Sequence, residues 1–149
     1  RGGADATVVR EFSISRREFV DDGFSLPEAK SRISWIDKDT VYVGTDFGPG
    51  SLTDSGYPRL VKRWRRDTPL GHADLVYEGH HSDVSIGAGY DDTPGYERHF
   101  VSRAIDFYNS EIYLLAPDTL ALERIVVSPR ISVPIRKAST PPAAAQRWA

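Results

Sequence analysis

The stretch that decides the fold is WIDKDTVYVGTDFGPGSLTDSGYPRLVKRWRR, residues 35–66. It contains most of a predicted β-hairpin, because two runs of alternating or β-branched residues, 31–36 and 40–45, flank a short polar turn. Residues 47–58 hold three glycines and two prolines, which predicts a loop. A third strand follows in 59–66, where cationic and apolar side chains are interleaved. This order of strands and loop is typical of one blade of a β-propeller.

Strand patterns continue on both sides of this stretch, whereas helical periodicity is nearly absent. Val9-Arg10-Glu11-Phe12 echoes Val61-Lys62-Arg63-Trp64 at a distance of about 50 residues, near the length of a four-stranded blade. Residues 7–23 are interpreted as the outer pair of strands of one blade. Residues 117–124 have a helical composition but are too few to predict a helix. Further strands are predicted at 7–12, 19–20, 75–77, 84–86, 100–107, 112–115 and 122–127.

We therefore predict an all-β chain that forms a partial β-propeller of about two to three four-stranded antiparallel blades. Residues 1–127 make up the propeller part, in blade fragments of about 4–24, 25–79 and 80–127. Residues 128–149 are rich in proline and alanine and predict an irregular tail, extended or disordered, because proline removes the donors of a strand ladder. A β-sandwich with similar hairpins remains an alternative fold.

The composition limits the classes of function. The chain has 149 residues, enough for one domain with a buried core, and 40% of them are hydrophobic. Its net charge is −2 with both signs interspersed, so we expect no nucleic-acid and no membrane partner. Cysteine is absent, which excludes disulfides and thiolate metal sites within this chain. No apolar run approaches the roughly 18 residues of a membrane-spanning helix.

A serine in the long loop is the first candidate for catalysis. Gly48-Pro49-Gly50-Ser51-Leu52 partly matches the G-x-S-x-G nucleophile elbow, in which the serine follows a strand and precedes a helix. The last glycine is missing and no helix follows, so we interpret Ser51 as part of a loop shaped by glycine and proline. The same loop lacks the lysine and the helix of a phosphate-binding loop.

Two clusters of titratable residues also have a structural interpretation. His80, His81 and Asp83 are close in sequence, but adjacent strand residues point to opposite faces, so a solvent-exposed turn is favoured over a metal site. Asp37 and Asp39 occupy a tight exposed turn, which lacks the buried cleft that general acid–base catalysis needs. We therefore predict no catalytic residue, no metal site and no cofactor in this chain.

The basic run Lys62-Arg63-Trp64-Arg65-Arg66 interleaves cationic and aromatic groups, as sites for single-stranded nucleic acids do. Acidic residues surround this run in the sequence, and the overall charge is negative. We therefore favour an outer strand with solvated and partly ion-paired side chains. Such charges also protect an exposed sheet edge from aggregation.

Four phrases of the sequence match a known family in order: GGADATVVREF, FSLPEAKSRISW, SWIDKDTVYVGTDFGPGSLTDSGYPRLVKRWRRDTPL and TPGYERHFVSRAIDFYNSEIYLL. Over residues 2–115 the chain resembles the N-terminal propeller region of the prolyl oligopeptidase family of serine peptidases. Members of this family join a β-propeller to an α/β-hydrolase domain that carries the catalytic Ser, Asp and His. The propeller caps the active site and restricts access to short peptides. The sequence contains no such hydrolase domain, so the resemblance implies a non-catalytic fragment.

The resemblance also implies a role in substrate gating. The expected partners are the α/β-hydrolase catalytic domain of a parent chain and its short peptide substrates. The candidates for the surface that faces this domain lie on one rim with residues 25–30, and they are Asp46, Phe47, Ser51 and Tyr57. The alternative is a free-standing β-rich protein-interaction module without enzymatic activity, anchored by Trp64, Tyr57 and the arginines.

Two further expectations concern the whole molecule. About two and a half blades cannot close a ring, so we expect exposed sheet edges, and with them either marginal stability of the chain alone or self-association through these edges. No signal-peptide pattern opens the sequence, which makes a cytoplasmic location the default. A periplasmic location stays open, because the sequence starts at Arg1.

Overall fold

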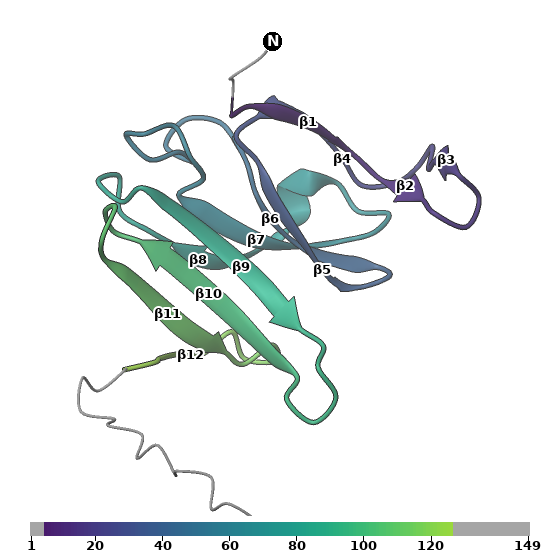
Figure 1. Ribbon diagram of the computed structural model, residues 1–149. Coiled ribbons are helices and arrows are strands. Elements are labelled where there is room, and N and C mark those ends of the chain that lie inside the picture. Colours follow the sequence, from purple (N-terminus) through teal and green to yellow (C-terminus); the bar gives the residue numbers. More distant parts are fainter. Residues whose placement is uncertain (1–4, 127–149) are drawn as a thin grey trace, which may run out of the picture.

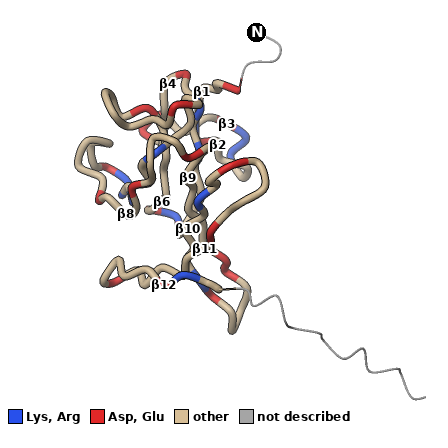
Figure 2. Tube along the Cα trace, turned by 90° about the vertical axis from the view of Figure 1, so that its left-hand side faces the viewer, with Lys and Arg blue, Asp and Glu red and all other residues tan. Residues whose placement is uncertain are grey.

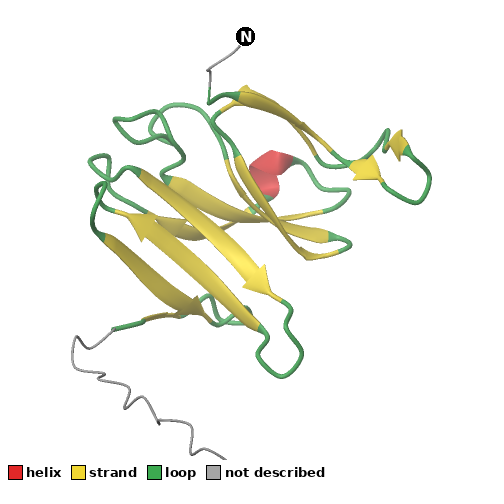
Figure 3. Cartoon of the chain, viewed as in Figure 1, coloured by secondary structure: helices red, strands yellow, loops and turns green. Residues whose placement is uncertain are grey.

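The computed structural model describes residues 5–126, and this part of the chain is built almost wholly from β-strands (Figure 1, Figure 3). The strands form four antiparallel sheets, two with four strands and two with two strands. One turn of 3-10 helix, η1 (Leu70–His72), is the single helical element of the described part. The strands are β1 (Thr7–Arg10), β2 (Phe12–Ser13), β3 (Glu18–Phe19), β4 (Ser25–Ala29), β5 (Arg32–Asp37), β6 (Thr40–Gly44), β7 (Leu60–Arg65), β8 (Asp74–Glu78), β9 (Ser85–Asp91), β10 (Arg98–Ala104), β11 (Ser110–Leu115) and β12 (Leu122–Arg124).

The first four-stranded sheet has the strand order β5-β6-β7-β8. The predicted hairpin is present as β5 and β6, with Trp35 opposite Val41. The third predicted strand is β7, which places Trp64 on the other side of Val41. The glycine-rich segment between β6 and β7 is a loop, as predicted, and a bridge between Leu52 and Pro58 closes it. We call this sheet the first blade.

The second four-stranded sheet, which we call the second blade, has the order β12-β11-β10-β9. Its strand β9 packs against β5, β6 and β7, so the two sheets stack face to face (Figure 1). The end of segment 117–124 belongs to strand β12 and is not helical. Two consecutive antiparallel sheets of four strands, stacked in this way, have the arrangement of neighbouring propeller blades. The predicted tail, residues 128–149, lies outside the described residues.

The core lies between the two blades. Because alternate residues of a strand face the same side, the apolar residues of β6–β8 and β9–β11 meet on facing sheet surfaces. Burial of each such side chain stabilises the fold by about 1.5–3 kcal/mol. The buried members of this core are Tyr42, Val61 and Val76 in the first blade and Ile86, Val101 and Leu115 in the second.

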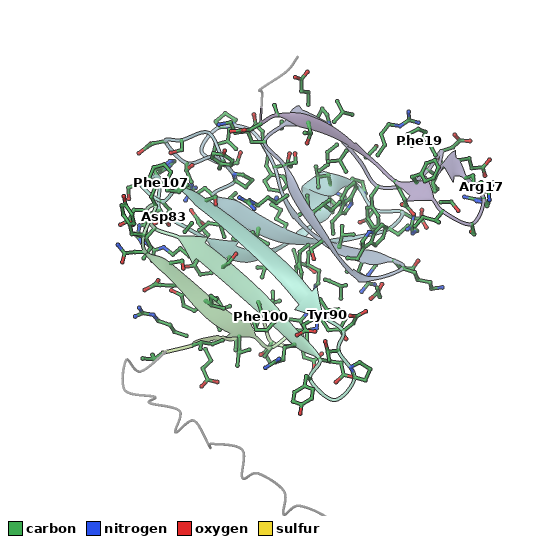
Figure 4. The ribbon with its side chains drawn as sticks, in the orientation of Figure 1. Arg17, Phe19, Asp83, Tyr90, Phe100 and Phe107 are labelled. Carbon is green, nitrogen blue, oxygen red and sulfur yellow. The ribbon has the colours of Figure 1, made fainter. Side chains whose placement is uncertain are left out.

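The N-terminal strands pair differently from the prediction. Strand β1 pairs with β4, and the residues between them form only the short hairpin β2–β3, so the interpretation of residues 7–23 as an outer blade pair is wrong. The hairpin turns tightly, with Arg17 at a φ of 59°, and the chain then returns alongside β1. Figure 4 shows Arg17 and Phe19 on this hairpin, which projects from the body of the protein. None of the described elements is a helix long and apolar enough to cross a membrane.

Candidate functional site

The connections between strands gather at two ends of the blades. The loop end comprises residues 45–59, 79–84 and 105–109, and the turn end comprises residues 38–39, 66–73, 92–97 and 116–121. Figure 4 shows Asp83 and Phe107 at the loop end, and Tyr90 and Phe100 at the opposite end. Acidic and basic residues are interspersed along the whole described trace (Figure 2). The predicted rim residues Asp46, Phe47, Ser51 and Tyr57 all lie at the loop end.

Ser51 belongs to the internal framework of the loop. Its side chain is buried, and its hydroxyl donates to the carbonyl oxygen of Gly48 at 2.6 Å. The Ser51 hydroxyl oxygen in turn accepts the backbone N–H of Phe47 at 2.8 Å. Asp46 lies 3.2 Å from the Ser51 hydroxyl, and its carboxylate accepts the N–H of Gly48 at 2.8 Å. These contacts hold the start of the loop in one conformation and match the interpretation of Ser51 as a loop residue.

Arg59 fixes the far side of the same loop. Its guanidinium donates to the carbonyl oxygen of Gly50 from Nε at 2.8 Å and from Nη2 at 2.6 Å. It also donates to the carbonyl oxygen of Gly79 at 3.0 Å and forms an ion pair with Glu78. From the sequence, Arg59 was predicted only as the first residue of the third strand, 59–66. Its role was missed because the partners are backbone carbonyls, which leave no pattern in a sequence.

Tyr57 joins the loop to the segment that precedes β5. Its hydroxyl donates to Asp5 at 2.6 Å, and this hydrogen bond raises the pKa of Tyr57. The ammonium of Lys30 lies over the Tyr57 ring, 4.2 Å from its centroid, and donates to the carbonyl oxygen of Ser55 at 3.1 Å. Lys30 therefore contacts the loop of residues 47–58. Ser25 does not, because it lies at the other end of β4, opposite Arg10.

The basic run of residues 62–66 is partly ion-paired, as predicted. The prediction of an outer strand is wrong, because β7 pairs with β6 on one side and with β8 on the other. Arg66 donates to both carboxylate oxygens of Glu11, at 2.9 and 3.0 Å, and these hydrogen bonds lower the pKa of Glu11 although burial opposes the shift. Trp64 donates from Nε1 to the carbonyl oxygen of Thr68 at 2.7 Å and packs edge-on against Phe24, with ring centroids 4.8 Å apart. Trp64 and Arg66 are thus engaged within the chain.

The acidic candidates are structural groups. Asp39 donates its backbone N–H to the Asp37 carboxylate at 2.7 Å, which forms the predicted turn. Asp83 is not in an exposed turn as predicted: it is 1% exposed, and Arg103 donates to both of its oxygens at 2.9 Å. Burial opposes its ionisation, but the hydrogen bonds from Arg103 and the His80 backbone prevail and lower the pKa of Asp83. Within residues 5–126 no group of three His, Cys, Asp or Glu could hold a metal ion.

A cleft of about 560 Å³ lies at the turn end between the blades. Arg63 lines it and donates to the carbonyl oxygen of Pro117 at 2.7 Å and to Asp74 at 3.3 Å. His99 lies there too, with its Nδ1 2.8 Å from the hydroxyl of Tyr42. The pair of Tyr42 and His99 was not predicted from the sequence, because the two residues are 57 positions apart and neither lies in a motif.

The chain is similar to segments of peptidases. No protein-family model matches it. It is 41% identical over 113 residues to the uncharacterized peptidase y4nA of Sinorhizobium fredii, a match that covers 74% of this chain and 16% of that protein. It is 27% identical over 124 residues to the uncharacterized peptidase RP174 of Rickettsia prowazekii, covering 76% of this chain and 17% of that protein. The chain thus spans about a sixth of the length of these curated relatives.

The fold is similar to that of a solved structure, a post-proline cleaving enzyme from Rickettsia typhi. The TM-score is 0.74 at 28% sequence identity, and the match covers 85% of this chain and 20% of the enzyme. These similarities confirm the resemblance to the prolyl oligopeptidase family and the prediction of a partial β-propeller.

Proposed function

We propose that this chain is part of the substrate-gating propeller of a prolyl-oligopeptidase-like serine peptidase that cleaves short peptides. One observation carries the proposal: the two stacked blades share their fold, over 85% of this chain, with the post-proline cleaving enzyme of Rickettsia typhi. The described residues are non-catalytic in this proposal. The catalytic Ser, Asp and His belong to an α/β-hydrolase domain, which is the partner of the propeller.

The loop end is suited to gating, because its longest loop is held by both blades. The hydroxyl of Thr53 donates to the carbonyl oxygen of Val84 at 3.1 Å, and the N–H of Asp54 donates to the carbonyl oxygen of His81 at 2.8 Å. Arg59 holds the other side of the loop from within the first blade. Functional loops are positioned by rigid scaffolds of this kind. We propose that this loop forms the rim that faces the catalytic domain.

A second candidate function, a protein-interaction module, is favoured by one turn. Phe107 is 93% and Tyr108 95% exposed. The turn that presents them is fixed by Asp106, whose carboxylate accepts the N–H groups of Tyr108 and Asn109 at 2.8 Å each. Two aromatic side chains on a rigid turn are typical anchors of a protein interface. The turn lies at the loop end, so it also suits contact with a catalytic domain.

The test is a chimaera of the Rickettsia typhi enzyme in which residues 5–126 replace the matching segment. We expect this chimaera to cleave a short chromogenic peptide after proline. We expect it to leave uncut a long unfolded protein that has the same amino-acid composition as the peptide. A chimaera that carries Arg59→Ala should cut longer peptides than the unsubstituted chimaera does, because its rim loop is loosened. Arg65→Ala, a change at the turn end, is the matched control.

A folded chimaera without post-proline cleavage would contradict the gating role. The non-catalytic assignment has its own test, in which the 149-residue chain alone is incubated with the same peptide. Turnover by this chain that disappears in Ser51→Ala would overturn the assignment.

A further inference from the structure

We propose that a cleft at the loop end binds the carboxylate of a short peptide through Arg32 and Lys30. The inference rests on the proposed function, because it names the group of a peptide substrate that the rim contacts. The cleft has a volume of about 250 Å³. It lies where β4 passes into β5, and β5 lies beside β9 of the second blade. Its lining residues are Asp5, Lys30, Ser31, Arg32 and Tyr57.

Arg32 is the available cation of this cleft. It is exposed, and it takes part in none of the ion pairs found among residues 5–126. Its stem passes over Gly87 of β9, where a Cβ atom would lie 3.6 Å from Cδ of Arg32. The Arg32 stem therefore packs against β9, and the second blade limits where the guanidinium can lie. A planar guanidinium with unused donors suits bidentate binding of a carboxylate.

Lys30 supplies a second positive charge in a fixed position. Its ammonium is held by the carbonyl oxygen of Ser55 at 3.1 Å and by the ring of Tyr57. The single acidic group of the cleft, Asp5, lies 3.8 Å from this ammonium and already accepts the Tyr57 hydroxyl. Two cations thus face one carboxylate, so the cleft carries a net positive charge and attracts an anion.

The size and the place of the cleft indicate the class of ligand. A volume of about 250 Å³ admits the end of a peptide but not a folded domain. The cleft adjoins the rim loop through Tyr57, so a peptide that passes the rim reaches it. The larger cleft at the turn end is a weaker candidate for an anion, because Asp37 and Asp74 line it together with Arg63 and Arg65. The carboxylate can come from the C-terminus of a peptide or from an acidic side chain.

The experiment measures binding of matched peptides to the 149-residue chain by calorimetry or NMR titration. The first pair is acetyl-Ala-Pro-Ala with a free C-terminus and its C-terminal amide. The second pair is acetyl-Ala-Glu-Ala-amide and the same peptide with Gln in place of Glu. We expect the charged member of at least one pair to bind about tenfold more tightly than the neutral member, since hydrogen bonds between charged groups are strong. The pair that shows the preference identifies the source of the carboxylate.

Variants then locate the site. Arg32→Ala should abolish the preference for the charged peptide, and Arg32→Lys should keep a part of it, because the charge remains while the bidentate geometry is lost. Arg65→Ala, another exposed arginine at the far end of the first blade, should leave the preference unchanged. Equal binding within both pairs, or a preference that survives in folded Arg32→Ala, would overturn the inference.

The outcome is separable from that of the gating test. Selective binding of the charged peptide by the chain, together with a folded but inactive chimaera, would contradict the proposed function and leave the carboxylate site in place. An active, size-selective chimaera with no such selectivity in the chain would leave the function in place and remove the site.

Discussion

The hydroxyl of Tyr42 and the Nδ1 atom of His99 lie 2.8 Å apart and join the first blade to the second. Burial raises the pKa of Tyr42 to about 12, so the phenol keeps its proton at neutral pH, and the tautomer of His99 sets which of the two groups donates. The His99 ring also stacks on Tyr90, with centroids 4.5 Å apart. The contact between the blades thus depends on an imidazole whose pKa is lowered by burial.

This contact predicts a stability that falls in mild acid. Burial, and secondarily the charge of Arg63, lowers the pKa of His99 below its ordinary value of 6.5. Below pH 6.5 the unfolded chain therefore binds a proton more readily than the folded chain, and folding stability decreases as the pH falls towards the folded pKa. The full contribution of neutral His99 to folding stability is present above pH 6.5. Denaturation curves between pH 7.5 and about 5 should show this loss, and His99→Gln should flatten it. An unchanged slope in His99→Gln would contradict the prediction.

The buried pair of Asp83 and Arg103 predicts a second, separate effect. Asp83→Ala should lower the free energy of unfolding by about 3 kcal/mol, because Arg103 is then left partly buried with a reduced set of partners. Its other carboxylate partner, Glu111, lies 3.3 Å away and limits the loss. Urea denaturation at neutral pH measures the change. The control is the exposed pair of Arg16 and Glu18, where Glu18→Ala should cost less than about 0.5 kcal/mol. Equal effects of the two substitutions would refute the prediction.

Two glycines form a matched pair for a packing test. A Cβ atom at Gly79 would lie 2.5 Å from Cδ1 of Ile86 and 2.8 Å from a carboxylate oxygen of Asp83, both of them buried. Gly79→Ala should therefore destabilise the protein by about 1–3 kcal/mol. A Cβ atom at Gly71 meets nothing within 4 Å, so Gly71→Ala should change stability by less than about 0.5 kcal/mol. Thermal unfolding of both variants decides whether the blades pack as closely as described.

Arg59 predicts a local change at the rim. Arg59→Ala removes the donors to the carbonyl oxygens of Gly50 and Gly79, and the loop of residues 47–58 should then open more often. Hydrogen exchange of the loop amides should accelerate severalfold while exchange in β6 stays slow, since local opening does not need the core to unfold. Arg65→Ala, whose side chain is exposed, should alter neither. Uniform acceleration throughout the sheet would show that Arg59 acts on global stability.

The parts that sequence analysis predicted correctly depend on short-range patterns. The β5–β6 hairpin, the loop of residues 47–58 and the turn at Asp37 each follow from residue types within a few positions of one another. The pairing of β1 was mispredicted because its partner, β4, lies beyond a small hairpin that also has strand character. An alternation pattern gives the faces of a strand but not the identity of its neighbour.

The candidate site was predicted only in outline for the same reason. The order of strands placed the four rim residues at one end of the blades, which is the loop end, and their role as a domain-facing surface stays a prediction. Arg32 was not singled out, and Asp83 was wrongly placed in an exposed turn. In both cases the surroundings come from distant segments, because Arg32 lies against β9 and Asp83 pairs with Arg103. Burial and charge pairing between such segments become visible only in three dimensions.

The shared core has a consequence for the folding of the chain during its synthesis on the ribosome. Tyr42 and Val61 reach full burial only against Ile86 and Val101, which are synthesised later. The first blade therefore remains exposed on one face until the first two strands of the second blade have left the exit tunnel. We therefore expect the nascent chain to be most prone to aggregation in the interval before residues 85–104 have left the exit tunnel.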